Sequence, residues 1–143
     1  MSGQGLKTKF VKTTAMERKI LITAALVAVV AIALGAFGAH ALKERLDVQQ
    51  LATFETGVRY QMYHALFLLF VGSTSVIGAV AKKRIFYATM IGILLFSVSI
   101  YVLATQSITG INFRPLGIVT PVGGLLLLTG WLILVRELLR IKS

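Results

Sequence analysis

The stretch ILITAALVAVVAIALGAF, residues Ile20 to Phe37, decides the fold of this chain, because it holds eighteen residues in a row without a charge. An α-helix rises about 1.5 Å per residue, so a run of roughly 17–21 residues crosses a hydrocarbon core of about 30 Å. The bilayer core offers no water to backbone polar groups, so such a run must satisfy them internally. The stretch therefore predicts a membrane-spanning helix.

Three more apolar runs follow, and together they predict spans at about residues 20–38, 62–81, 85–105 and 117–135. The composition agrees, since 57% of the 143 residues are hydrophobic and only 14% are charged, which is too apolar for an ordinary soluble domain. We expect an all-α membrane protein with four transmembrane helices in an antiparallel bundle. Residues 1–19 would form a basic cytoplasmic tail and residues 20–143 the transmembrane domain.

The basic residues predict the orientation. Eleven of the fifteen lie in the N-terminal tail, in the second connection (82–84) and in the C-terminal tail, and four lie in the first and third connections. Such a bias places both termini in the cytoplasm. The net charge of +10 is spread between apolar runs rather than gathered in a patch, so we expect the lipid bilayer and no nucleic acid as partner.

The first connection and the start of the second span carry the candidate polar site. Apolar residues recur mostly every fourth position in LKERLDVQQLATFETGVRYQM, residues 42–62, which predicts an amphipathic helix between the first two spans. The next turns place Gly57, Tyr60, Gln61 and His64 on one helix face. We expect this face to meet His40 beneath the outer membrane surface. Glu55 or Asp47 would supply a carboxylate partner.

The residue types leave several interpretations of this site open. A proton-sensing site, a metal site, a small-ligand site and a hydrogen-bond network that fixes the bundle all fit. Two histidines on separate segments, in a chain without cysteine, fall short of a metal ligand set. The sequence holds no phosphate-binding glycine loop and no nucleophile elbow. We therefore expect no cofactor and no enzymatic activity.

Small residues predict where the helices pack. Their spacing places them on helix faces that allow two backbones to approach closely. The candidates are Gly35, Gly38, Gly92, Ser99, Gly123, Gly124 and Gly130. These faces serve either contacts within the bundle or the interface of a homo-oligomer, and one sequence does not separate the two.

Two boundaries have alternative interpretations. Thr120 can cap a fourth helix whose first residue is Pro121, or the helix can begin at Leu116 and kink at Pro121. Residues 39–41 (AHA) resemble a signal-peptide cleavage site, but the apolar run before them exceeds the usual 7–15 residues. We expect no cleavage there.

Four ordered blocks carry a family resemblance. LGAFGAHALKERL (34–46), FETGVRYQMYHAL (54–66), GILLFSVSIYVLA (92–104) and TPVGGLLLLTGW (120–131) resemble the small four-span bacterial proteins of the domain-of-unknown-function-423 family and the similar transmembrane protein 256-like proteins. The resemblance implies an uncleaved protein of the bacterial inner membrane and no particular activity. One departure is Val98, where the family often has glycine, and we expect a looser helix contact there.

These observations favour a non-enzymatic membrane protein. It would act as an accessory or assembly subunit, or bind a small ligand or lipid, with a homo-oligomer or a membrane protein as partner. The alternative is a small oligomeric transporter or channel centred on His64.

Overall fold

The computed structural model describes residues 13–110, 112 and 115–141, and all regular secondary structure in this part of the chain is helical. The prediction of an all-helical protein is thus confirmed. Most of the predicted basic tail, residues 1–12, lies outside the described residues. The elements are α1 (Ala15–Phe37), η1 (Gly38–Leu42), α2 (Val48–Ser73), α3 (Ala79–Ile93), η2 (Leu94–Val98), α4 (Ser99–Ala104), α5 (Gln106–Thr109) and α6 (Leu116–Leu139), where η marks a π-helix.

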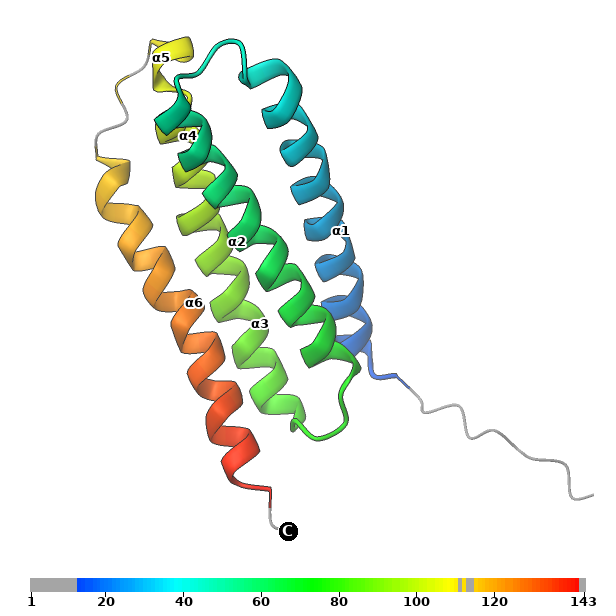
Figure 1. Ribbon diagram of the computed structural model, residues 1–143. Coiled ribbons are helices and arrows are strands. Elements are labelled where there is room, and N and C mark those ends of the chain that lie inside the picture. Colours follow the sequence, from blue (N-terminus) through cyan, green and yellow to red (C-terminus); the bar gives the residue numbers. More distant parts are fainter. Residues whose placement is uncertain (1–12, 111, 113–114, 142–143) are drawn as a thin grey trace, which may run out of the picture.

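The long helices lie side by side along one direction, and each runs opposite to the one before it (Figure 1). The main contacts pair α1 with α2 and α3 with α6, while α2 also packs on α3, η2 and α4. Since α3, η2 and α4 follow one another without a break, they act as one long helix. This helix packs on each of the other three long helices, α1, α2 and α6.

Within the part of the chain that the structure describes, three helices are long and apolar enough to cross a membrane, namely Ala15–Leu42, Ala79–Ala104 and Leu116–Leu139. The helix α2 is not among them, because glutamines, charged residues and His64 lower its hydropathy between Gln49 and His64. Two of these polar residues nevertheless lie inward, since Gln61 and His64 are buried on the same face as Phe54 and Leu68. Burial among other helices explains how a less apolar helix fits this fold.

The amphipathic helix predicted between the first two spans is the first part of α2 and runs into the second long helix. Residues from Val48 onward form the first half of α2 and continue without interruption to Ser73. Asp47 starts the helix through a capping box with Gln50. Gly57, the one candidate hinge, is buried within the helix, and no other breaker stands before Gly72.

The turn between the second and third long helices lies earlier than the sequence indicated. The helix α2 ends at Ser73, and α3 begins at Ala79, so the basic residues 82–84 belong to α3 rather than to the connection. The side chain of Ser73 bonds back to the Leu69 carbonyl at 2.7 Å, and Thr74 is extended. Small polar residues favour such a helix end because their side chains compete for backbone bonds.

The fourth long helix begins at Leu116 and includes Pro121 within it. The interpretation of Thr120 as its N-cap was wrong, and the alternative start at Leu116 is the one observed. Pro121 is the sixth residue of α6, so the single backbone bond it lacks is one to Gly117 near the helix start. The Thr120 hydroxyl instead lies 2.7 Å from the Ser99 hydroxyl on α4.

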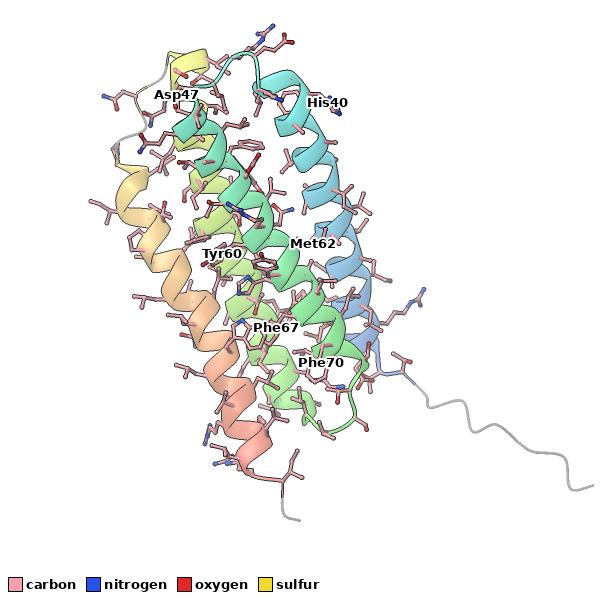
Figure 2. All side chains as sticks on the ribbon, viewed as in Figure 1. His40, Asp47, Tyr60, Met62, Phe67 and Phe70 are labelled. Atoms are coloured by element: carbon pink, nitrogen blue, oxygen red, sulfur yellow. The ribbon has the colours of Figure 1, made fainter. Side chains whose placement is uncertain are left out.

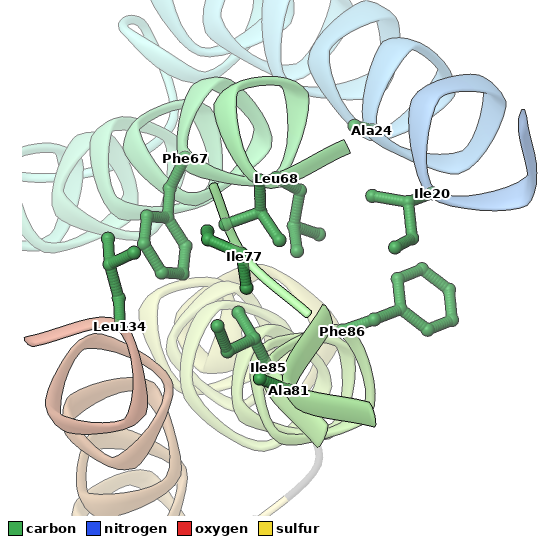
Figure 3. Packing of buried hydrophobic residues seen from close by; sticks show 10 residues of the cluster. Ile20, Ala24, Phe67, Leu68, Ile77, Ala81, Ile85, Phe86 and Leu134 are labelled. Atoms are coloured by element: carbon green, nitrogen blue, oxygen red, sulfur yellow. The ribbon is translucent and has the colours of Figure 1, made fainter. Parts of the chain in front are cut away.

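The buried apolar residues form two clusters, one toward each end of the bundle. The larger cluster joins all four long helices through residues such as Ile20, Leu68, Ile85 and Leu134 (Figure 3). The smaller cluster lies where η1, the start of α2 and α4 meet and contains Leu42, Leu46, Phe54 and Ala104. Along α2, the candidate polar residues Gln61 and His64 lie between the two clusters.

Several of the expected packing residues lie at close contacts within the single chain. A Cβ atom at Gly123 would lie 2.4 Å from the backbone nitrogen of Phe96, and one at Gly92 would lie 3.0 Å from the backbone nitrogen of Leu127. A Cβ at Gly130 would lie 2.8 Å from Thr89 Oγ1. These contacts bring α6 against α3 and η2.

The other three glycines predicted to pack helices, Gly35, Gly38 and Gly124, are less constrained. A Cβ at Gly38 would lie 3.2 Å from the Phe54 ring and one at Gly35 would lie 3.4 Å from Val58, so both face α2. Gly124 would meet only the Phe96 ring at 3.6 Å, an ordinary contact.

Candidate polar site in the helix bundle

The helix α2 places the expected polar face against the interior of the bundle, as the spacing of Gly57, Tyr60, Gln61 and His64 suggests. Gly57, Gln61 and His64 are buried, with Gln61 4% and His64 6% exposed. Tyr60 is 42% exposed and stands at the edge of the site. Figure 2 shows Tyr60 near the middle of the bundle's length, so the site lies deeper than the expected position beneath the outer surface.

Both ring nitrogens of His64 are bonded within the chain. Its Nδ1 lies 2.7 Å from the backbone carbonyl oxygen of Tyr60, and its Nε2 lies 3.3 Å from Nε1 of Trp131 on α6. A carbonyl only accepts and an indole N–H only donates. The two contacts therefore fit one arrangement, a neutral ring with the proton on Nδ1.

Gln61 joins α2 to two other helices. Its Nε2 donates a 2.9 Å hydrogen bond to the Val27 carbonyl of α1, and its Oε1 accepts a 2.8 Å bond from the Tyr101 hydroxyl of α4. An amide has both donors and acceptors, which is why one residue can bridge a carbonyl and a hydroxyl. Gln61 and His64 together connect α2 with α1, α4 and α6.

Aromatic rings surround these two polar side chains. Trp131 stacks on Phe67 with ring centroids 4.1 Å apart, and His64 meets both rings edge-on. On the other side Tyr60 lies 5.0 Å from Phe96 between ring centroids. Such contacts exclude water and hold the ring of His64 in one orientation.

Gly57 makes room for the residue that Gln61 binds. A Cβ at position 57 would lie 2.7 Å from Cε1 of Tyr101. The Tyr101 ring also packs on Phe54, with centroids 4.9 Å apart. A side chain at Gly57 would displace this ring and with it the hydroxyl that bonds to Gln61.

The expectation that His40 joins this site was wrong. His40 lies in η1, is exposed and stands at the end of the bundle, away from Tyr60 (Figure 2). The α1 residue that contacts the site is Val27, and His40 follows it by more than three helix turns, so His40 lies at another depth of the bundle. Of the two expected carboxylate partners, Asp47 caps α2 and Glu55 is exposed.

Sequence reasoning missed the residues that complete the site, Trp131 and Tyr101. Neither residue was assigned to the site from the sequence. A signal was present, because tyrosine and tryptophan in an apolar helix need a partner for their polar atom. The pairing itself depends on how α4 and α6 pack on α2, which the spacing along one helix does not encode.

A second buried polar contact lies at the end of the bundle where α1 and α3 begin. Lys82, only 3% exposed, pairs with Glu17, which is 23% exposed. Thr14 and Glu17 form a capping box at the start of α1. Next to this pair, the ammonium group of Lys19 lies 5.4 Å from the ring centroid of Tyr87 and 3.4 Å from its hydroxyl. These contacts fix the first turn of α1 on α3.

An open groove of about 260 Å³ runs between α1 and the α3–η2 helix, and Gln61 forms part of its lining. Its rim is apolar and includes Leu26, Leu94 and Val98, all more than 40% exposed. Val98, where we expect a looser helix contact, lines this groove.

Among the described residues, no group of three or more histidine, cysteine, aspartate or glutamate side chains could hold a metal ion. The site is a set of hydrogen bonds between helices, set among aromatic rings. An apolar helical bundle with such a site is typical of a helical membrane protein whose helices are joined by polar residues.

The comparisons with known proteins agree with this class. The family model described as protein of unknown function (DUF423) matches residues 34–124. The chain belongs to this family, and the resemblance seen in its sequence is confirmed. No solved structure matches the chain.

The relatives are membrane proteins of diverse bacteria. The UPF0382 membrane protein SSP2132 of Staphylococcus saprophyticus is 40% identical over 115 residues, which cover 80% of this chain and 92% of that protein. The UPF0382 membrane protein of Haemophilus influenzae is 36% identical, covering 90% and 99%. The UPF0382 inner membrane protein YgdD of Escherichia coli is 34% identical, covering 88% and 93%. The chain is thus a bacterial membrane protein of this family.

Proposed function

We propose that all four long helices cross the inner membrane, with both termini in the cytoplasm. The 26 residues of α2 extend roughly 39 Å at 1.5 Å per residue, enough to cross a core of about 30 Å. Its buried polar side chains, Gln61 and His64, face the bundle, which is where polar residues in the middle of membrane helices belong. Basic residues at the start of α1, the start of α3 and the end of α6 lie at one end (Figure 1), which supports a cytoplasmic position for that end.

We further propose that the protein is non-enzymatic and acts by binding lipid or a membrane partner, as an accessory or assembly protein. The observation that carries this proposal is the bonding of His64. A catalytic or proton-carrying histidine needs a ring nitrogen that can reach a substrate or water. Both nitrogens of His64 are instead used within the chain, and the residue is 6% exposed.

Gln61 supports the same conclusion, since its amide oxygen and nitrogen both bond to other helices. Interhelical hydrogen bonds of this kind contribute about 0.6–2 kcal/mol each in membrane proteins. The polar site then fixes the relative positions of the helices. The outward faces of α1 and α6, which carry exposed residues such as Leu26 and Leu125, are left to contact lipid or a partner.

Native mass spectrometry of the tagged protein, extracted from its own membranes in a mild detergent, tests this proposal. It reads intact mass, retained lipid and co-purifying protein together. We expect a lipid or a protein in a fixed ratio to the chain, retained equally by wild type and by Trp131→Phe if the fold is kept.

The opposing function is transport or conduction through His64. Proteoliposomes loaded with a pH-sensitive dye distinguish it, when an applied proton gradient is followed in wild type and in His64→Ala. We expect no flux above that of empty liposomes. Flux in wild type that disappears in His64→Ala would overturn the proposal and establish a transporter or channel.

A further inference from the structure

A cavity of about 390 Å³ lies between the first turn of α3 and the last turns of α6. The start of α3 and the end of α6 lie at the same end of the bundle as the start of α1 (Figure 1). The lining of the cavity is formed by residues 78–81 together with Arg84, Ile133, Arg136, Glu137 and Arg140. The four residues from α6 recur at positions i, i+3, i+4 and i+7, so they share one helix face.

The lining carries more positive than negative charge. Three arginines face one carboxylate, that of Glu137, and the nearest approach between them is 3.9 Å, from Arg140 Nη1 to Glu137 Oε1. Arg84 and Arg136 have neither an ion pair nor a hydrogen bond with any residue that the structure describes. Two guanidinium groups from two helices are therefore available to a ligand.

Two other basic residues at this end already contact side chains of the bundle. Lys82 is buried against Glu17, and Lys19 lies over the rings of Phe86 and Tyr87. The unpaired positive charge that lies in a concave surface at this end is thus that of the cavity arginines. Its opposite wall is the first turn of α3, which has Gly78 at its N-cap and no side chain that caps it. The backbone N–H groups of a first turn have no partner within their helix, so this wall also favours an anion.

We propose that this cavity binds the phosphate group of an anionic phospholipid. Guanidinium groups recognise phosphate oxygens through paired hydrogen bonds, and basic pockets between helices on the cytoplasmic side suit anionic headgroups. Apolar side chains adjoin the charges, since Ile133 lines the cavity and Val80 is 68% exposed. A lipid would place its phosphate at the arginines and its acyl chains along this apolar surface. The proposal rests on the four-span arrangement proposed above, which puts this end at the membrane surface.

Titration of the purified full-length protein in an uncharged detergent, followed by native mass spectrometry, tests the site. Phosphatidylglycerol and phosphatidylcholine are added in equal amounts. We expect wild type to retain phosphatidylglycerol at least threefold more than phosphatidylcholine. The variant Arg84→Gln/Arg136→Gln should lose that preference, with about tenfold weaker retention of phosphatidylglycerol.

The matched control is Arg18→Gln/Lys83→Gln, which removes the same charge from exposed positions at the same end, outside the cavity. We expect this control to retain the lipid as wild type does. Equal losses in both variants, or no preference in wild type, would overturn the proposal.

Competition with inorganic phosphate distinguishes a site for a lipid headgroup from a site for free phosphate, since both ligands offer phosphate oxygens. We expect 10 mM phosphate to displace little of the bound phosphatidylglycerol, because it lacks the apolar contacts. Complete displacement would make the cavity a site for free phosphate and overturn the assignment to a lipid. If the lipid preference is absent while cysteine labelling still supports four spans, this inference fails and the proposed topology remains.

Discussion

Trp131 on α6 donates the hydrogen bond from its indole N–H to Nε2 of His64 on α2, across 3.3 Å. The residues are 67 positions apart in the sequence. With Nδ1 of His64 facing the Tyr60 carbonyl, this contact assigns the imidazole one tautomer. It also explains how an ionisable residue is accommodated within an apolar bundle.

The first prediction concerns this tautomer. Nitrogen-15 NMR of histidine-labelled protein in lipid should show His64 as a neutral ring with the proton on Nδ1, and His40 provides the exposed reference. The variant Trp131→Phe removes the donor and should lower the free energy of unfolding by about 0.6–2 kcal/mol. A proton on Nε2, or on both nitrogens, at pH 7 in wild type would contradict the geometry.

The second prediction concerns the bridge from Gln61 to Tyr101. Gln61→Met and Tyr101→Phe each remove one partner of the 2.8 Å hydrogen bond. A double-mutant cycle, measured by unfolding in mixed micelles, should give a coupling energy of about 0.5–2 kcal/mol. Independent effects of the two substitutions would show that the bond contributes nothing to stability.

The third prediction concerns the closest helix contact. Gly123→Ala puts a methyl group 2.4 Å from the Phe96 backbone nitrogen, so α6 must move away from η2. We expect a loss of about 1–3 kcal/mol in unfolding free energy, as for other overpacked sites. Gly117→Ala is the matched control in the same helix, because nothing lies within 4 Å of its added methyl group, and it should leave stability unchanged or raise it. Similar melting temperatures for Gly123→Ala and wild type would show that the helices do not pack this closely.

The fourth prediction uses the unequal burial of Glu17 and Lys82. Glu17→Gln keeps a side chain able to complete the capping box but leaves the ammonium of Lys82, 3% exposed, without its partner. It should lower the free energy of unfolding, because the buried ammonium group loses its ion-pair partner. Lys82→Met should cost less, because Glu17 is 23% exposed and can reach water. The double variant should recover most of the loss. A greater loss of unfolding free energy in Lys82→Met than in Glu17→Gln would contradict the assignment of Lys82 as the buried partner.

Much of the bundle could be predicted from the sequence, because apolar runs and their flanking charges follow from the cost of placing polar groups in lipid. The polar face of α2 was also predicted, since Gln61 and His64 lie four and seven residues after Gly57 on the same side of one helix. Such arguments depend only on spacing within a helix.

The partners of that face could not be predicted in the same way. Trp131, Tyr101 and the Val27 carbonyl come from three other helices, and their meeting depends on helix rotation and depth. His40 was placed in the site because it ends the first apolar run, but its position on η1 turns it outward. Lys82 was assigned to a connection because it begins a basic run. Lys82 lies three, four and seven residues before Ile85, Phe86 and Thr89, which are all buried on α3. This spacing places Lys82 on the same buried helix face.

The four-span arrangement is the central claim, and cysteine labelling tests it most directly, because the natural chain has no cysteine. Glu44→Cys, Ser75→Cys and Thr109→Cys each place a thiol at an exposed position in or beside a connection. In intact cells, a membrane-impermeant maleimide should label positions 44 and 109 but reach position 75 only after the cells are opened. If α2 does not cross the membrane, Ser75→Cys will instead react from outside together with Glu44→Cys, and the account of α2 as a spanning helix will be wrong.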